Sequence, residues 1–191
     1  MKFRDLNNPI FVGEYSPEAE WKRTLLIDFG KRFGLNTLVE TGTSHGGTVM
    51  ECIPYFQEIY TIELEPSLVA KATKRFAEFA NVRVIAGSSG EKLSELLDTL
   101  GGRPVLFWLD AHLTGGVSAS NGDQTTPELA AIAEKSPQSL VVIDDVKPPS
   151  AVSGRYEAPD APVVVPQGWT TIFLHGELVL HAGGYDIPEK F

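Results

Sequence analysis

The feature that most constrains the fold of this chain is a repeated alternation of short apolar runs with helical stretches. The apolar runs lie at 37–41, 58–63, 82–86, 105–110 and 139–143. They are continuously apolar rather than alternating in polarity, as is typical of parallel strands buried on both faces. An alternation of this length predicts an α/β fold with a right-handed, doubly wound and mostly parallel sheet.

Helix signals between these runs support the same fold. Ser16 has the chemistry of an N-cap, Pro17 suits the first helical position, and Gly34 ends the first helix. Further helices are expected at 46–55, from Pro66, at 91–100 and from Pro127. We expect 112–126 and 146–168 to be surface loops, followed by a hairpin of strands at 170–175 and 178–182.

Composition limits the possible functions. The 191 residues, with 42% hydrophobic content, suit a single domain over 1–191 whose first 15 residues are irregular. The excess of 25 acids over 16 Lys and Arg argues against a nucleic-acid or anionic-membrane surface. The first residues lack the apolar core of a signal peptide, and a single cysteine, Cys52, fits a reducing compartment. We therefore expect a cytoplasmic protein.

The turn after the first strand is the strongest candidate for a ligand site. Glu40 ends the strand, and Gly42, Gly46 and Gly47 precede a helical stretch. A strand, a glycine-rich turn and a helix N-terminus can bring backbone N–H groups against a ligand, although such a turn can also be only a sharp corner. Thr43 stands where a dinucleotide site has its middle glycine, and the adjacent acid disfavours a pyrophosphate but suits a ligand with a cationic amino group.

Two later positions complete this ligand hypothesis. Glu63, followed by Leu64, ends the second strand at the position from which an acid accepts hydrogen bonds from ribose hydroxyls. Ser88 follows the third strand and can place a hydroxyl against an adenine edge. A nucleoside that carries an amino acid tail fits all three features.

These motifs resemble those of the class I S-adenosylmethionine-dependent methyltransferases. The matching segments are VETGTSHGG, YTIELEP, IAGSS and FWLDAH, and the pair LDAH and VVIDD is most similar to the small metal-dependent O-methyltransferases of macrolide, aminocoumarin and catechol type. The resemblance implies a seven-stranded sheet with a final antiparallel strand, which the hairpin can supply. It also implies that the methionine part is lined by Glu40, Gly42, Thr43, Ser44, Gly46 and Gly47, and the ribose is held by Glu63 beside Leu64.

Acids at two further strand ends predict a metal site. Asp110 ends the fourth strand, and Asp144 and Asp145 end the fifth. Carboxylates that converge at one sheet edge repel unless a cation binds between them, and Mg²⁺ prefers such oxygen ligands. The related O-methyltransferases use acids at these strand ends as metal ligands. Alternatively, Asp144 caps a turn and Asp110 orders the amino group of the cofactor.

The catalytic assignment is Asp110 together with His112, which lies two residues further on and can accept the proton of an acceptor hydroxyl. His112 can equally be a ligand or a hydrogen-bond donor. The sequence thus predicts methyl transfer from S-adenosylmethionine to a hydroxyl of a small polar acceptor, assisted by a divalent metal. The alternatives are a hydroxylase-like relative of the same fold and a non-catalytic nucleoside-binding or scaffold protein. A homodimer is conceivable, because the sheet is thinly covered near the hairpin.

Overall fold

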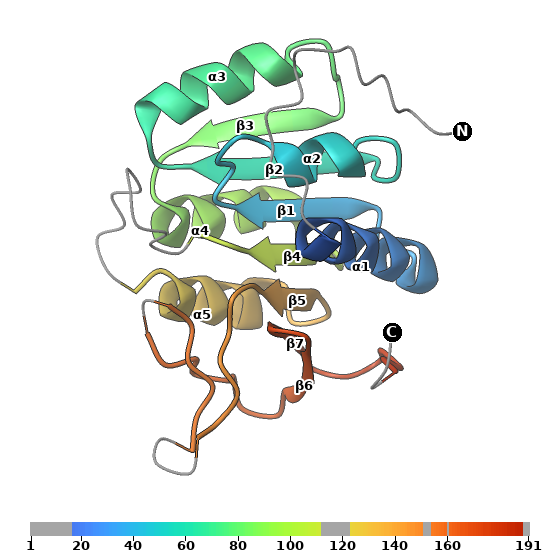
Figure 1. Cartoon of the computed structure of the whole chain (residues 1–191), viewed down its shortest axis with the longest axis vertical. Helices are drawn as coiled ribbons and strands as arrows, with labels where there is room; N and C mark the ends of the chain where they lie inside the picture. The colour runs from blue at the N-terminus through green and yellow to red at the C-terminus, as the bar shows by residue number, and fades with distance from the viewer. Residues whose placement is uncertain (1–16, 112–122, 151–153, 160, 189–191) are drawn as a thin grey trace.

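The computed structural model describes residues 17–111, 123–150, 154–159 and 161–188. Helices and strands alternate along most of this part of the chain (Figure 1). The helices are α1 (Pro17–Phe33), α2 (Gly47–Cys52), α3 (Pro66–Phe76), α4 (Ser89–Leu100) and α5 (Thr125–Lys135). The strands are β1 (Thr37–Thr41), β2 (Glu58–Glu63), β3 (Val82–Ala86), β4 (Leu106–Leu109), β5 (Leu140–Ile143), β6 (Thr170–Leu174) and β7 (Glu177–His181).

The strands form one seven-stranded sheet in the order β3-β2-β1-β4-β5-β7-β6. The first five strands pair in parallel, whereas β7 pairs antiparallel with both β5 and β6. The predicted doubly wound sheet with an antiparallel C-terminal hairpin is therefore confirmed. Strand order reverses beside β1, and the β1–β4 junction is the switch point at which ligands bind in open α/β sheets.

Helices cover both faces of this sheet, as expected for buried parallel strands. In Figure 1 the helices α1 and α2 lie in front of the strands, and α4 and α5 lie behind them. The core is correspondingly divided. Leu38 of β1 packs with apolar residues of α1, α2 and α3, whereas its neighbour Val39 packs with those of α4 and α5. The side chains of successive residues in a strand thus point to opposite faces of the sheet.

The element boundaries follow local chemistry closely, with three shifts. Helix α1 begins at Pro17, and Gly34 follows its last residue with a φ of 66°, as predicted. Helix α2 is shorter than the expected 46–55, since it ends at Cys52. Helices α4 and α5 each begin two residues earlier than expected, at Ser89 and Thr125.

The segment between β5 and β6 contains no helix within its described residues, in agreement with the expected loop. Its backbone folds on itself through antiparallel bridges that join Lys147 to Glu157 and Glu157 to Pro162. In Figure 1 this segment lies at the hairpin end of the sheet. No helix among the described residues is long and apolar enough to cross a bilayer.

Candidate active site

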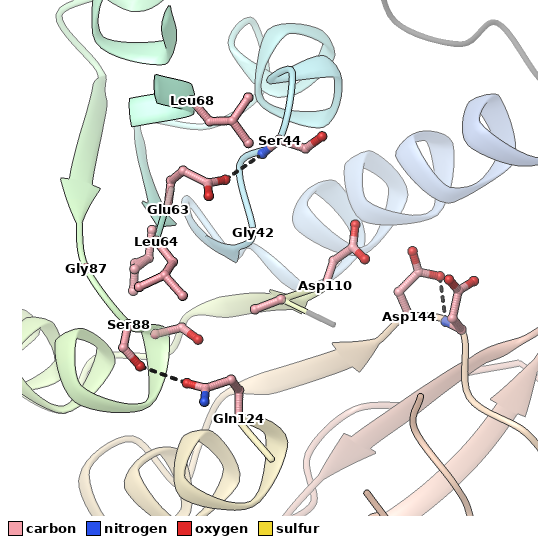
Figure 2. Close-up of a pocket in the computed structure, with 14 residues that line it drawn as sticks. Gly42, Ser44, Glu63, Leu64, Leu68, Gly87, Ser88, Asp110, Gln124 and Asp144 are labelled. Atoms are coloured by element: carbon pink, nitrogen blue, oxygen red, sulfur yellow. Dashed lines mark hydrogen bonds between the residues drawn. The ribbon is translucent and has the colours of Figure 1, made fainter. Parts of the chain in front are cut away.

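A pocket of about 260 Å³ lies at the carboxyl ends of the parallel strands, where the switch-point rule places a ligand. Figure 2 shows the side chains that converge on it from the ends of β1, β2, β3, β4 and β5. The residues that line it are Gly42, Ser44, Ile62, Glu63, Leu64, Leu68, Gly87, Ser88, Ser89, Asp110, Ala111, Gln124, Asp144 and Asp145. Six of the ten predicted cofactor residues are among them: Gly42, Ser44, Glu63, Leu64, Ser88 and Asp110.

Glu63 is fixed in this pocket by two backbone donors. One carboxylate oxygen, Oε2, accepts a hydrogen bond from the N–H of Ser44 at 2.9 Å, and Oε1 accepts one from the N–H of Glu65, also at 2.9 Å. Figure 2 shows the first of these bonds joining the glycine-rich turn to the end of β2. Each carboxylate oxygen has two acceptor sites. Glu63 is therefore held in one orientation and keeps acceptor capacity for a ligand hydroxyl.

The three glycines of the turn have different roles. Gly42 has a φ of 89°, and a Cβ at that position would lie 2.5 Å from the backbone oxygen of Asp110. At Gly46 a Cβ would lie 2.6 Å from the ring of Phe76, and at Gly47 it would lie 2.6 Å from the guanidinium of Arg23. Gly46 and Gly47 do not line the pocket. These two glycines leave room for the side chains of Phe76 and Arg23, and their predicted contact with the methionine part stays a prediction.

Glu40 and Thr43 lie beneath the turn rather than in the pocket wall. The hydroxyl of Thr61 donates to Glu40 Oε2 at 2.5 Å and lies 2.6 Å from the hydroxyl of Thr43. Burial raises the pKa of Glu40 to about 8, since desolvation penalises the charged form more than the hydroxyl of Thr61 stabilises it. Neither residue lines the pocket, so their predicted contact with the methionine part is indirect at most.

The third strand end contributes a wall that the sequence only partly predicted. The Ser88 hydroxyl donates to the side-chain oxygen of Gln124 at 2.8 Å (Figure 2), and the N–H of Gly90 donates to the same oxygen at 3.2 Å. Gln124 immediately precedes α5, and sequence analysis did not single it out. Through these two hydrogen bonds, the Gln124 side chain connects the start of α4 to the start of α5 beside the pocket.

The carboxyls of Asp110, which is half-buried, and Asp144, which is buried, lie at the other end of the pocket (Figure 2). The pKa of Asp110 is raised well above its usual value by burial, and the nearby carboxylates of Asp144 and Glu40 raise it further. Burial also raises the pKa of Asp144, although the ammonium of Lys22 opposes that shift. A cationic ligand beside Asp110 would relieve this cost, because an opposite charge favours the ionised form.

The predicted three-aspartate metal site does not form among the described residues. No group of three or more His, Cys, Asp or Glu side chains in that part of the chain could hold a metal ion. Lys22 of α1 lies among the carboxylates instead, with Nζ 2.6 Å from Asp144 Oδ1 and 3.3 Å from Asp145 Oδ1. The donor set therefore does not fit the expected Mg²⁺.

Lys22 and Glu177 do not line the pocket but lie beside its carboxylates, and sequence analysis missed both. Glu177 begins β7, and its Oε1 lies 3.8 Å from Lys22 Nζ. One signal was present for Lys22: it lies four residues before Leu26 and seven before Phe29, on the buried stripe of α1. For Glu177 no signal existed, because it follows Gly176 in a hairpin turn. The predicted base His112 lies outside the described residues.

Comparisons with known proteins give a fold but no sequence family. No family model matches the chain, and no curated protein is similar to it. Among solved structures, the candidate methyltransferase yhhF of Escherichia coli matches with a TM-score of 0.56 and 13% identity, over 91% of each chain. The O-methyltransferase TomG of Streptomyces achromogenes, which acts in tomaymycin synthesis and was solved with S-adenosylmethionine, matches with a TM-score of 0.52 and 21% identity, over 70% of this chain and 62% of TomG.

A third solved structure is the O-methyltransferase of Bacillus cereus in complex with S-adenosylhomocysteine. It matches with a TM-score of 0.53 and 13% identity, over 70% of this chain and 59% of that chain. These identities are too low to transfer an activity, so the likeness concerns architecture. Together with the strand order and the antiparallel β7, it shows that this chain has the Rossmann-like fold of the class I S-adenosylmethionine-dependent methyltransferases.

Proposed function

We propose that this protein transfers a methyl group from S-adenosylmethionine to a hydroxyl of a small polar acceptor. The observation that carries the proposal is the position of Glu63, which two backbone N–H groups hold at the carboxyl end of β2 in the pocket wall. An acid at this place in a doubly wound sheet accepts hydrogen bonds from the hydroxyls of a ribose. TomG and the Bacillus cereus enzyme, which share the fold, were solved with S-adenosylmethionine and S-adenosylhomocysteine.

The charges of the pocket also support this cofactor. S-adenosylmethionine carries a sulfonium and an amino group, both cationic, and a ribose between the adenine and the methionine part. Asp110 offers a carboxyl whose ionisation is opposed by Asp144 and Glu40, so a cation beside it is stabilising. Ser88 and Gln124 offer polar atoms near the end of β3, where an adenine edge can be recognised.

The residues of the pocket would position and desolvate the reactants. The cofactor supplies an electrophilic methyl group; a carbon–oxygen bond to the acceptor forms while the sulfur–carbon bond breaks, leaving S-adenosylhomocysteine. The hydroxyl proton passes to a protein base. Asp110 is our candidate for that base, with His112 retained as a second. Alignment of acceptor and methyl group inside a closed pocket supplies most of the rate enhancement in such a transfer.

Methylation at oxygen is proposed because TomG and the Bacillus cereus enzyme, which were solved with a cofactor or its product, are both O-methyltransferases. The divalent metal expected from the sequence is left out, because Lys22 already pairs with Asp144 and Asp145. The other two functions considered from the sequence, hydroxylation and nucleoside binding without catalysis, share the pocket. A measurement of transfer distinguishes them from the proposal.

Cofactor binding is tested by calorimetry with S-adenosylhomocysteine. Wild type is expected to bind, and Glu63→Gln is expected to bind about 10- to 100-fold more weakly, because hydrogen bonds to a charged acceptor contribute about 1.5–3 kcal/mol. The matched control is Glu65→Gln. Glu65 is two residues away, its side chain accepts a hydrogen bond from the N–H of Ser67, and it does not line the pocket. Equal losses in both variants, or binding of a nicotinamide dinucleotide instead, would contradict the proposal.

Transfer itself is tested with labelled S-adenosylmethionine and a panel of catechols, sugars and single-hydroxyl compounds, with amines as the comparison class. Incorporation of label at oxygen supports the proposal. Cofactor binding without incorporation into any compound would favour the non-catalytic alternative, and incorporation only into amines would correct the acceptor class.

A further inference from the structure

The ammonium of Lys22 occupies the space between carboxylates that come from separate elements. Asp144 and Asp145 follow β5, and Glu177 begins β7, and all three have a carboxylate oxygen within 3.8 Å of Lys22 Nζ. The Lys22 side chain is only 16% exposed, while those of Asp144 and Glu177 are 6% and 1% exposed. Its more exposed neighbour Glu18 is 3.6 Å away on the same helix. The Asp145 side chain is also exposed, at 47%, so Lys22 joins two buried carboxyls, those of Asp144 and Glu177, to two exposed ones.

The backbone around Asp145 is arranged to complete this cluster. Asp145 has a φ of 52°, a left-handed conformation that is uncommon for a residue other than glycine. In that conformation its N–H donates to Asp144 Oδ1 at 2.7 Å, and its own carboxylate reaches Lys22. Such conformations cost free energy and persist where the surroundings determine them. The pairing with Lys22 is a determinant of that kind.

Glu177 joins the cluster through its contact with Lys22, and burial raises its pKa to about 8 although the ammonium of Lys22 opposes that rise. Within the described residues its buried Oε2 has no hydrogen-bond partner. Removing one member of a buried ion pair is far more costly than the pair is stabilising, because the remaining charge is left uncompensated. Lys22 is the cation that compensates these acids.

A divalent cation at this end of the pocket would have to compete with that ammonium. Mg²⁺ binds carboxylate oxygens at about 2.0–2.1 Å and Ca²⁺ at about 2.3–2.6 Å. The Asp144 Oδ1 that would serve as a ligand already contacts Lys22 Nζ at 2.6 Å and the N–H of Asp145. A dication bound there would also be repelled by the lysine at short range.

We propose that Lys22 is the resident cation beside the end of the pocket formed by Asp110, Asp144 and Asp145, where the acceptor would bind, and takes the place of a divalent metal. The consequence for catalysis is that methyl transfer requires no divalent metal. Only this consequence rests on the proposed function. The acceptor then needs no second oxygen to chelate a metal. Compounds with a single hydroxyl are therefore expected to be methylated at the same rate as vicinal diols and catechols of similar size.

Binding of Mn²⁺, followed by electron paramagnetic resonance of the free ion, tests the assignment without reference to activity. Wild type is expected to leave Mn²⁺ free at micromolar concentrations, whereas Lys22→Met is expected to bind it at least 10-fold more tightly. The double variant Lys22→Met with Asp144→Asn is expected to lose that gain. Lys31→Met is the matched control, since Lys31 lies on the same helix, is exposed and contacts Tyr55 instead. Equal Mn²⁺ affinity in wild type and Lys22→Met would overturn the proposal.

If Lys22→Met does not fold, the Mn²⁺ affinity of wild type is compared with that of Asp144→Asn. A Mn²⁺ site of micromolar affinity in wild type that disappears in Asp144→Asn would overturn the proposal, and equally weak binding by both would support it. S-adenosylhomocysteine binding is measured on the same samples. A protein that binds neither S-adenosylhomocysteine nor Mn²⁺ would refute the proposed function and leave the role of Lys22 standing, so the two failures are distinguishable.

Discussion

The two ends of the pocket are built by different physical means. The turn side, which comprises Gly42, Ser44 and Glu63, is held by backbone hydrogen bonds and by one glycine against the neighbouring strand. The carboxylate side comprises Asp110, Asp144 and Asp145 and is held by charge, through Lys22, which is more than 120 positions earlier in the sequence than Asp145. The turn side is thus a local motif, whereas the carboxylate side depends on how distant elements pack.

The largest effect is expected where the two sides touch. Gly42→Ala places a Cβ 2.5 Å from the Asp110 backbone oxygen at a φ of 89°. We expect it to lower the free energy of unfolding by about 4 kcal/mol, from backbone strain and the clash together, and to abolish cofactor binding. Urea unfolding and calorimetry measure both.

The control for this variant is Gly34→Ala. Gly34 also has a positive φ, of 66°, but a Cβ there would meet nothing within 4 Å. It should lose only about 1 kcal/mol, the cost of the left-handed conformation alone. Equal losses in the two variants would mean that the contact between the turn and β4 does not matter.

This contrast also describes what the sequence could predict. The strands, the turn and Glu63 were predicted because each rests on signals within a few residues. The cluster around Lys22 was not predicted, because this lysine of α1 meets Asp144 after β5 and Glu177 of β7 only after the sheet has formed. The need for glycine at 46 and 47 could not be fully predicted either, since the side chains that would meet a Cβ there belong to Phe76 of α3 and Arg23 of α1.

Charge is expected to matter beneath the turn side as well. Because the pKa of Glu40 is about 8 in the folded protein, against 4.5 as its ordinary value, the folded state binds a proton that the unfolded state releases. Its contribution to stability is therefore complete at low pH and is lost as the pH rises through this interval. From pH 5.5 to 7.5 we expect wild type to lose about 3 kcal/mol relative to Glu40→Gln.

Urea unfolding at several pH values measures this difference. Glu78→Gln, at an exposed position of the chain, is the control and should follow wild type at every pH. If Glu40→Gln has the same pH dependence as wild type, Glu40 is already ionised in the folded protein and the turn side contains no buried proton.

On the carboxylate side, the pH dependence of cofactor binding reports on Asp110. Its pKa is raised in the free protein by burial and by Asp144, so pairing with a cationic cofactor requires loss of a proton. We expect affinity for S-adenosylmethionine to rise with pH, by up to about tenfold per unit below the raised pKa. Asp110→Asn should flatten this dependence. Calorimetry in buffers of different ionisation enthalpy would detect the proton released on binding. Binding to wild type without proton release would contradict this prediction.

The smallest effect is expected at the wall that follows β3, which belongs to neither side. Gln124→Ala removes the acceptor shared by the Ser88 hydroxyl and the N–H of Gly90. Each lost hydrogen bond is worth about 1 kcal/mol and water can replace part of it, so S-adenosylhomocysteine affinity should fall about threefold. Gln138→Ala, at an exposed position away from the pocket, should leave affinity unchanged. A threefold loss of affinity in both variants would show that Gln124 has no specific role in cofactor binding.

The central claim is that Glu63 and Asp110 face one pocket that takes a nucleoside with a cationic amino acid tail. A crystal structure of the protein grown with S-adenosylhomocysteine tests it most directly. The account predicts ribose hydroxyls within hydrogen-bonding distance of the Glu63 carboxylate, with Lys22 still paired to Asp144. A ligand bound elsewhere, or a Glu63 carboxylate without contact to the ribose, would contradict it.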